Sequence, residues 1–182
     1  VNFNIIAITS LSRDHLDYHK TFKKYKRAKL RLFSEVSNQG IAIINKCVPD
    51  YKDFIEVAKS NNLKVITIGS SVSANWKYKI NNINNGIQEI EVIFNKVKTK
   101  VYSNLIGSFQ INNLITAISI MVEMGFRREK IEKLISKLKA PPGRLELIQR
   151  KKGANIYIDY AHTPDALKTV LMAIRPYIKN KL

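Results

Sequence analysis

The sequence predicts an α/β fold, because short apolar runs alternate with segments of helical periodicity. Residues 3–9, 40–45 and 64–69 are rich in isoleucine and valine, which is typical of parallel strands buried on both faces. Amphipathic patterns separate these runs at residues 21–36 and at residues 49–60. Strand, helix, strand, helix, strand is the order of a parallel sheet covered by helices.

The pattern then changes to short alternating strands. Residues 76–80, 88–94 and 99–104 alternate apolar and polar side chains, and turn signals separate them at residues 84–86 and 95–96. We therefore expect an antiparallel meander beside the parallel sheet.

Two more helices are expected after the meander. The first begins at Gly107 with Ser108 as its N-cap and stops at Gly125. Its apolar residues fall on two sides, so we expect it to be buried on both: Ile111, Leu114, Ile118 and Val122 on one, and Ala117, Ile120 and Met124 on the other. The second helix, residues 129–139, ends at a Pro/Gly run, residues 140–143, which is the best candidate for a domain boundary.

The length of 182 residues suits one domain, or one domain and part of another. Because the chain begins with Val1 inside a predicted strand, we expect a fragment of a longer protein. The single cysteine, Cys47, excludes an internal disulfide framework. No signal peptide or long apolar run is present, so we expect a cytoplasmic protein without membrane insertion.

The formal net charge is +17, which would ordinarily indicate nucleic-acid binding. Here the lysines are spread along the chain among many asparagines and isoleucines, which favours compositional drift over a dedicated groove. The same positive field would attract polyanionic substrates such as nucleotides. A basic nucleic-acid-binding α/β module remains the alternative from a different class.

The segment from Ser12 to Val36 concentrates chemistry at a strand-to-helix junction, with two histidines and two acids: His15, His19, Asp14 and Asp17. The following helix carries Lys29 in the middle of an apolar face made by Phe22, Tyr25, Leu32, Phe33 and Val36. Apolar surroundings disfavour the ammonium form, which makes the neutral, nucleophilic amine accessible. Alternatively, Lys29 extends its ammonium to the surface.

The run Ser-Arg-Asp-His-Leu-Asp-Tyr-His at residues 12–19, followed by Lys29, resembles the central-domain signature of the Mur ligase family. The resemblance is closest to the UDP-N-acetylmuramoyl-tripeptide synthetase branch, which adds the third residue of the peptidoglycan stem peptide. It implies that CO2 carbamylates Lys29 and that His15 is a magnesium ligand. One departure is Ser10, where the family usually has asparagine.

Residues 107–114 resemble the adenine-contact helix of the family, in which Phe-Asn-x-x-Asn is usual. The resemblance implies nucleotide contacts by Asn113 and by Gln110, which stands where the first asparagine is usual. Gly-Arg-Leu-Glu at residues 143–146 resembles a Gly-Arg-Met-Glu motif whose arginine, here Arg144, reaches nucleotide phosphates. On spacing alone, Asn113 is a structural amide and Arg144 a solvated surface residue.

Residues 156–167 form a strand, a turn and a helix start, with Thr163 as N-cap and Pro164 as the first helical residue. This stretch matches the opening of the family's C-terminal domain nearly letter for letter. The match implies that Asp159 and His162 face the nucleotide. Without the family, Asp159 is interpreted as the cap of a turn.

The resemblance assigns residues 1–140 to the C-terminal part of a Mur ligase central ATPase domain and residues 141–182 to the start of the Rossmann-like C-terminal domain. The expected reaction uses ATP and Mg²⁺. The carboxylate of the UDP-N-acetylmuramoyl dipeptide attacks the γ-phosphate, and the amine of a diamino acid, expected to be meso-diaminopimelate, takes the acyl phosphate.

Several motifs of the family lie outside these residues, including its phosphate-binding Gly-Lys-Thr loop and the motif that selects diaminopimelate or lysine. We therefore expect this chain to be inactive alone, and we expect a monomer that binds no nucleic acid. Folylpolyglutamate synthetase, from the same family, and the product of a truncated reading frame are the remaining alternatives.

Overall fold

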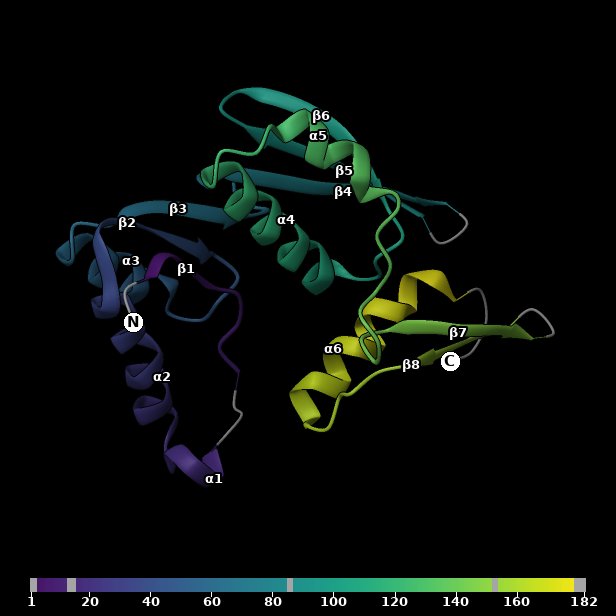
Figure 1. Cartoon of the computed structure of the whole chain (residues 1–182). Helices are drawn as coiled ribbons and strands as arrows, with labels where there is room; N and C mark the ends of the chain where they lie inside the picture. Colours follow the sequence, from purple (N-terminus) through teal and green to yellow (C-terminus); the bar gives the residue numbers. More distant parts are fainter. Residues whose placement is uncertain (1–2, 13–15, 85–86, 152–153, 179–182) are drawn as a thin grey trace.

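The computed structural model describes residues 3–12, 16–84, 87–151 and 154–178. A six-stranded sheet with strand order β1-β2-β3-β4-β5-β6 forms the centre (Figure 1). The first four strands pair in parallel and the last two antiparallel: β1 (Phe3–Ile8), β2 (Val36–Asn45), β3 (Lys64–Gly69), β4 (Trp76–Asn84), β5 (Ile87–Phe94) and β6 (Val97–Ser103). The predicted parallel sheet and meander are therefore halves of one sheet.

Strand β2 is buried on both faces, as its apolar sequence predicts. Ile43 and Ile44 are both fully buried, but they belong to different hydrophobic cores because neighbouring side chains on a strand point to opposite faces. Each buried side chain of this size stabilises the fold by about 1.5–3 kcal/mol. The sheet therefore divides the molecule into two cores.

One core contains α2 (Phe22–Arg31), a 3₁₀ turn (Leu32–Glu35) and α3 (Tyr51–Ser60), and a short helix, α1 (Leu16–His19), precedes α2. The predicted single helix over residues 21–36 is wrong at its end. Val36 already pairs with Phe3, so the chain leaves the helix through the 3₁₀ turn and begins β2 four residues earlier than expected. Leu32, predicted to be buried, is 37% exposed.

The other core contains α4 (Ser108–Glu123) and α5 (Arg128–Ile135), which ends before residue 139. Gly107, with φ of 87°, is the N-cap of α4 in place of Ser108, which is the first helical residue. Gly125, with φ of 92°, follows the helix as predicted. The second apolar side of α4 is only partly covered, since Ala117 and Met124 are exposed whereas Ile120 packs against the core.

A second, two-stranded antiparallel sheet follows the Pro/Gly run, with β7 (Glu146–Lys151), β8 (Ala154–Ile158), α6 (Pro164–Ile174) and a 3₁₀ turn (Arg175–Tyr177) (Figure 1). Strand β7 was not expected from the sequence. Thr163 caps α6 as predicted, since its Oγ1 accepts a hydrogen bond of 3.2 Å from the amide of Ala166. Among the described residues, no helix is long and apolar enough to cross a bilayer.

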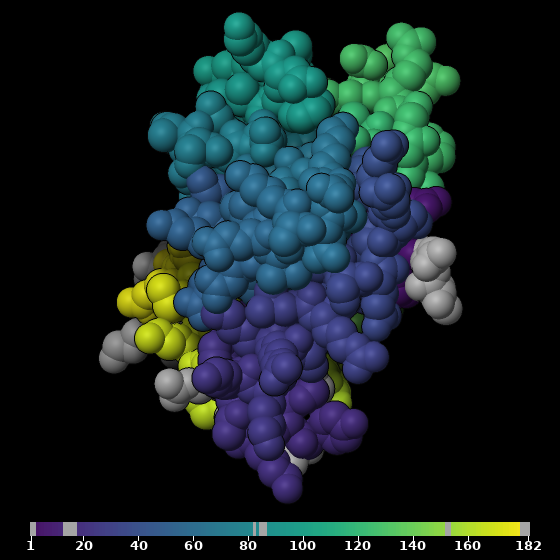
Figure 2. Space-filling view, turned by 90° about the vertical axis from the view of Figure 1, so that its left-hand side faces the viewer, coloured from purple at the N-terminus to yellow at the C-terminus, as the bar shows by residue number. Residues whose placement is uncertain are grey.

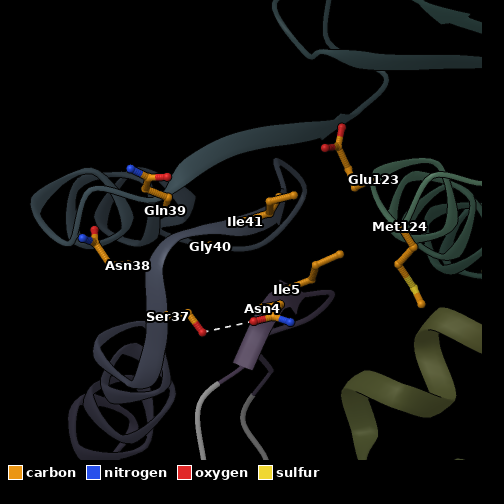
Figure 3. A pocket seen from close by; sticks show the side chains of 9 residues that line it. All are labelled: Asn4, Ile5, Ser37, Asn38, Gln39, Gly40, Ile41, Glu123 and Met124. Atoms are coloured by element: carbon orange, nitrogen blue, oxygen red, sulfur yellow. Dashed lines mark hydrogen bonds between the residues drawn. The ribbon is translucent and has the colours of Figure 1, made fainter.

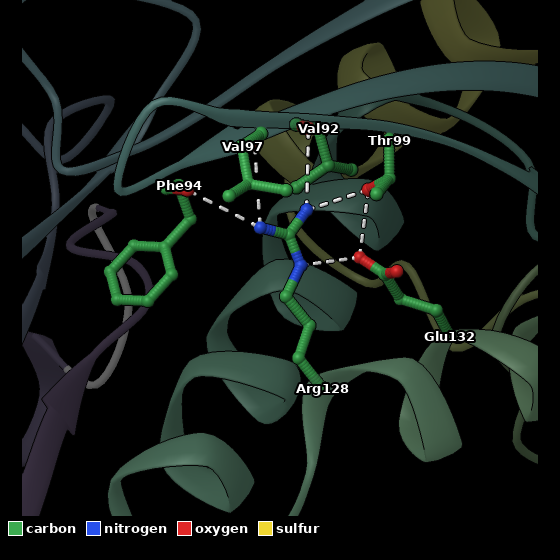
Figure 4. A network of polar contacts seen from close by, with 6 residues as sticks. All are labelled: Val92, Phe94, Val97, Thr99, Arg128 and Glu132. Carbon is green, nitrogen blue, oxygen red and sulfur yellow. Dashed lines mark hydrogen bonds and ion pairs between the residues drawn. The ribbon is translucent and has the colours of Figure 1, made fainter.

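A buried arginine joins α5 to the meander (Figure 4). The Arg128 guanidinium donates to Thr99 Oγ1 at 2.6 Å and to Glu132 Oε1 at 2.6 Å. It also donates to three main-chain carbonyls at 3.4 Å, those of Val92, Phe94 and Val97. The Arg128 side chain is only 10% exposed, so its removal would take a donor away from several partly buried acceptors.

Arg128→Ala is therefore expected to lower the free energy of unfolding of the chain by roughly 3 kcal/mol, because the largely covered Glu132 carboxylate loses its charged partner and keeps only the Thr99 hydroxyl as a donor. Chemical denaturation measures this change. The matched control is Arg127→Ala, because the Arg127 side chain is 76% exposed and its change should stay within about 0.5 kcal/mol. Equal effects of the two substitutions would contradict a structural role for the Arg128 network.

Candidate functional site

Gln110, predicted to contact the nucleotide, lies in the first turn of α4 and is 5% exposed. Its Nε2 donates to the main-chain carbonyl of Arg144 at 3.1 Å. This bond ties α4 to the segment that precedes β7. The Gln110 amide therefore has a structural partner within the chain.

The side chains of Arg144, Tyr160 and His162 form a contiguous polar surface beside this bond. The exposed Arg144 guanidinium lies 5.6 Å from the centre of the Tyr160 ring, a cation–π distance. The rings of Tyr160 and His162 meet edge to face at 4.9 Å, and His162 Nδ1 lies 2.9 Å from the Tyr160 carbonyl oxygen. The predicted residues Arg144 and His162 thus both lie against Tyr160.

Asp159 connects the two strand ends beneath that surface. One carboxylate oxygen accepts from the amide of Leu145 at 2.8 Å and the other from the amide of Ala161 at 2.7 Å. Leu145 is 2% exposed and has φ of 48°, a conformation that few leucines adopt, so the Asp159 bond helps to hold it. The sequence left two interpretations of Asp159, a nucleotide contact and the cap of a turn. Its two hydrogen bonds to main-chain amides are those of a turn cap.

Asn113 and its neighbour Asn112 lie in different environments on α4. Asn113 is exposed on α4, three residues after Gln110. Asn112 is 8% exposed, and its Oδ1 accepts a bond of 3.0 Å from the hydroxyl of Tyr78. Burial raises the pKa of Tyr78 to about 12. The structural amide is thus Asn112, and the Asn113 side chain faces solvent.

Lys29, the predicted carbamate, is half-buried on α2. Its Nζ lies 5.0 Å from the centre of the Tyr25 ring, and the same ring lies 5.1 Å from the ring of His19. His15, the predicted magnesium ligand, lies outside the described residues. Sequence periodicity thus identified a lysine that packs on a buried aromatic ring.

Within the described ranges, no group of three or more His, Cys, Asp or Glu side chains lies close enough to hold a metal. Oxygen ligands are what magnesium requires. Only a carbamate on Lys29 would add such oxygens at the predicted position. The described residues therefore supply at most part of a magnesium ligand set.

A cavity of about 410 Å³ lies at the edge of the sheet where β1 and β2 begin (Figure 3). It is lined by the amino-terminal halves of β1 and β2 and the end of α4, including Asn4, Ser37, Glu123 and Met124. Ser37 Oγ donates to Asn4 Oδ1 at 3.1 Å. None of the residues predicted for a site lines this cavity.

The arrangement defines a class of protein: an α/β domain whose helix α4 is tied to a second unit by a polar junction. Residues 1–121 match the family model of the Mur ligase middle domain, and residues 143–182 match that of the Mur ligase, glutamate ligase domain. The chain belongs to the Mur ligase family.

The chain is 38% identical over 175 residues to the UDP-N-acetylmuramoyl-L-alanyl-D-glutamate--2,6-diaminopimelate ligase of Rickettsia typhi, covering 94% of this chain and 34% of that protein. It thus spans about a third of this relative's length. A solved structure with the same protein name superposes with a TM-score of 0.79 at 29% identity, covering 98% of this chain and 37% of the other.

The MurF ligase of Thermotoga maritima, solved in complex with ADP, superposes with a TM-score of 0.79 at 18% identity, over 94% of this chain and 39% of the other. At this identity the likeness shows the fold alone. The α/β fold inferred from the sequence is confirmed by these superpositions.

Asp159→Asn should lower the free energy of unfolding by roughly 1–3 kcal/mol, because an amide can present only one of the two acceptor oxygens and its NH₂ then faces a main-chain donor. Hydrogen exchange of the Leu145 and Ala161 amides should quicken. Asp165→Asn is the matched control, since Asp165 is exposed in the first turn of α6. Unchanged exchange at Leu145 would show that the Asp159 carboxylate does not hold this turn.

Proposed function

We propose that this chain is part of an ATP-dependent ligase of peptidoglycan precursor synthesis. The reaction joins a diamino acid, meso-diaminopimelate, to UDP-N-acetylmuramoyl-L-Ala-D-Glu. The observation that carries the proposal is the match of residues 1–121 and residues 143–182, in this order, to two Mur ligase domains, together with 38% identity to a ligase of that name. In this proposal residues 1–140 belong to the first of these domains and residues 141–182 to the second.

The proposed reaction has two steps. A carboxylate oxygen of the dipeptide bonds to the γ-phosphorus of ATP and ADP leaves. The amine nitrogen then bonds to the acyl carbon, phosphate leaves, and the nitrogen loses a proton. Several anionic oxygens come together in both steps, so fixed positive charge is required.

The exposed side chains at the junction suit this task. The planar fork of Arg144 is permanently charged and matches the geometry of a phosphate. The exposed amide of Asn113 offers a donor and an acceptor for a nucleotide base, and His162 lies beside Arg144 across Tyr160. In this proposal Gln110 and Asp159 hold the backbone of the nucleotide site.

The second part of the proposed site is Lys29 with His15. The neutral amine of Lys29 bonds to the carbon of CO2 and loses a proton, which replaces a cation by an anionic, oxygen-bearing carbamate. Such a group and the imidazole of His15 would hold Mg²⁺, which supplies charge neutralisation for phosphate oxygens when bound. The whole protein is inferred to act in the cytoplasm as a monomer.

The function is tested first at Lys29 in the full-length enzyme. Lys29→Ala should abolish ligation with an unchanged melting temperature, and acetate should restore part of the activity by filling the vacated position with a carboxylate. Lys29→Arg should remain inactive, since a guanidinium cannot become a carbamate. Lys24→Ala, an exposed lysine on the same helix, is the control. Near-normal activity of Lys29→Arg would exclude the carbamate.

Arg144→Ala in the full-length enzyme should lower kcat/KM for ATP by roughly 10- to 150-fold, the equivalent of a charge-assisted bond of about 1.5–3 kcal/mol. The main-chain bond from Gln110 remains, so thermal stability should change little. Arg150→Ala, an exposed arginine on β7, controls for net charge. Unchanged kinetics with a large fall in melting temperature would make Arg144 structural.

A further inference from the structure

Four large apolar side chains are exposed where α4 ends and α5 follows. Met124 is 63% exposed, Phe126 54%, Leu134 54% and Leu138 40%. A single exposed apolar side chain is common on a folded protein and needs no explanation. Here all four fall within residues 124–138, so the fold leaves a whole group of neighbouring apolar positions uncovered.

The packing of α5 explains why its leucines face outwards. Ile131 and Ile135 are 7% and 1% exposed and belong to the core that contains α4. The guanidinium of Arg128 also bonds to the meander, so the helix cannot rotate about its axis without loss of both contacts. With that face fixed inwards, Leu134 and Leu138 lie on the flank of the helix and remain in contact with solvent.

Exposed cations accompany these apolar side chains. They are Arg127, Lys130, Lys133, Lys137 and Lys139. Residues 124–139 all lie within the described part of the chain, and the acids among them are Glu129 and Glu132. The Glu132 side chain is only 14% exposed and is paired with Arg128, whereas Glu129 is 71% exposed. Five exposed cations and one exposed carboxylate give this surface a net charge of +4.

Lysines and leucines alternate along one flank of α5. They follow one another at steps of four, three and one residue, which is the spacing of a single helical face: Lys130, Leu134, Lys137 and Leu138. The winding continues past Ile135, where α5 ends, because the amide of Lys137 donates to the Leu134 carbonyl at 3.0 Å and the next amide donates to the Ile135 carbonyl at 3.1 Å. Figure 2 shows this part of the chain, in light green, projecting at the upper right of the molecule.

Three classes of anionic partner would be attracted by this charge, and the apolar side chains distinguish them. The phosphates of a nucleic acid need cations but make no use of exposed leucines. An acidic amphipathic helix of another protein lays its apolar face into a groove, whereas residues 124–139 project from the molecule (Figure 2). A bilayer with anionic headgroups uses both features, because apolar side chains enter the boundary between headgroups and acyl chains while lysines and arginines stay among the phosphates.

We propose that residues 124–139 are a peripheral membrane-binding surface, which we call the α5 surface, and that its partner is a bilayer that carries anionic headgroups. Phe126, Leu134 and Leu138 enter the headgroup boundary, and the five cations bind the headgroup phosphates. The α5 surface holds the protein at the bilayer without a membrane-spanning segment. None of the residues proposed for the ligase reaction belongs to it.

The test measures binding of the full-length enzyme to unilamellar vesicles by cosedimentation at physiological salt. One set of vesicles contains equal parts of phosphatidylglycerol and phosphatidylcholine, and the other contains phosphatidylcholine alone. Binding to the first set should be at least roughly 100-fold tighter, because each cation near an anionic bilayer contributes about fivefold. It should also weaken as salt is added, since salt screens the attraction.

Two double variants separate the charged from the apolar contribution. Lys130→Glu with Lys137→Glu should weaken binding to the anionic vesicles by at least roughly 25-fold, because two cations are lost. Phe126→Ser with Leu134→Ser keeps the charge and should weaken binding by roughly tenfold or more, because less apolar area enters the boundary.

The matched control is Lys52→Glu with Lys59→Glu. It makes the same change of charge at two exposed positions of α3, which packs on the other face of the sheet. Vesicle binding of this variant should stay within about twofold of the wild type, because screening limits the reach of these charges. Melting temperatures, and ligation without vesicles, should match the wild type in every variant, since all the changed side chains are exposed.

Equal binding to the two sets of vesicles, or no binding to either, would overturn the α5 surface, as would equal losses in the α5 and α3 variants. Anionic vesicle binding that survives Phe126→Ser with Leu134→Ser, and that duplex DNA displaces, would identify a general polyanion patch and overturn it as well. Ligation is not measured through this surface, so an active Lys29→Ala would count against the proposed function and leave the vesicle result unchanged.

Discussion

The burial of β2 on both faces is the constraint on which the rest of the structure depends. Ala42, Ile43 and Ile44 are fully covered, with β1 and β3 on the two edges and helices over both faces. Every backbone polar group of such a strand must be paired inside the sheet, so no ligand can reach the middle of the strand. Ligands can therefore be bound only at the strand ends. At the carboxyl end of β2 the first polar residue is Asn45.

The residues proposed for the two parts of the site lie on helices that pack against opposite faces of the sheet. The core that packs α2 and α3 carries Lys29, whereas the other carries α4 with Gln110 and Asn113. Elements on opposite faces of one sheet can cooperate only where their ends meet beyond the strands. The hydrogen bond from Gln110 to the carbonyl of Arg144 connects α4 to the C-terminal unit and holds the backbone of Arg144 beside the first turn of α4.

Local signals predicted much of the fold, and non-local pairing accounts for the errors. The bounds of β3 were correct because apolar β-branched runs are self-contained signals. The end of α2 could not be predicted, since it depends on the pairing of Val36 with Phe3 across the sheet. Strand β7 carries no alternation, and its half of the ladder is defined only by β8.

The candidate site shows the same limit. Long motifs identified Arg144, Asp159 and His162, but no motif indicated that Asp50 and Lys26, which are 24 positions apart, form an ion pair. Partner choice among many lysines depends on the fold, because any of them could pair with an exposed carboxylate.

The residues of the motifs proposed to bind the nucleotide fall into two groups once their hydrogen bonds are assigned. The side chains of Gln110 and Asp159 form hydrogen bonds with the backbone of the junction, including that of Leu145, which has a positive φ. Arg144 and His162 have exposed side chains beside them. A motif of this kind encodes both a rigid loop and the groups that the loop presents, and only the second group must touch a ligand. Substitution of a loop-holding residue would therefore change nucleotide binding indirectly, by releasing the backbone that positions Arg144.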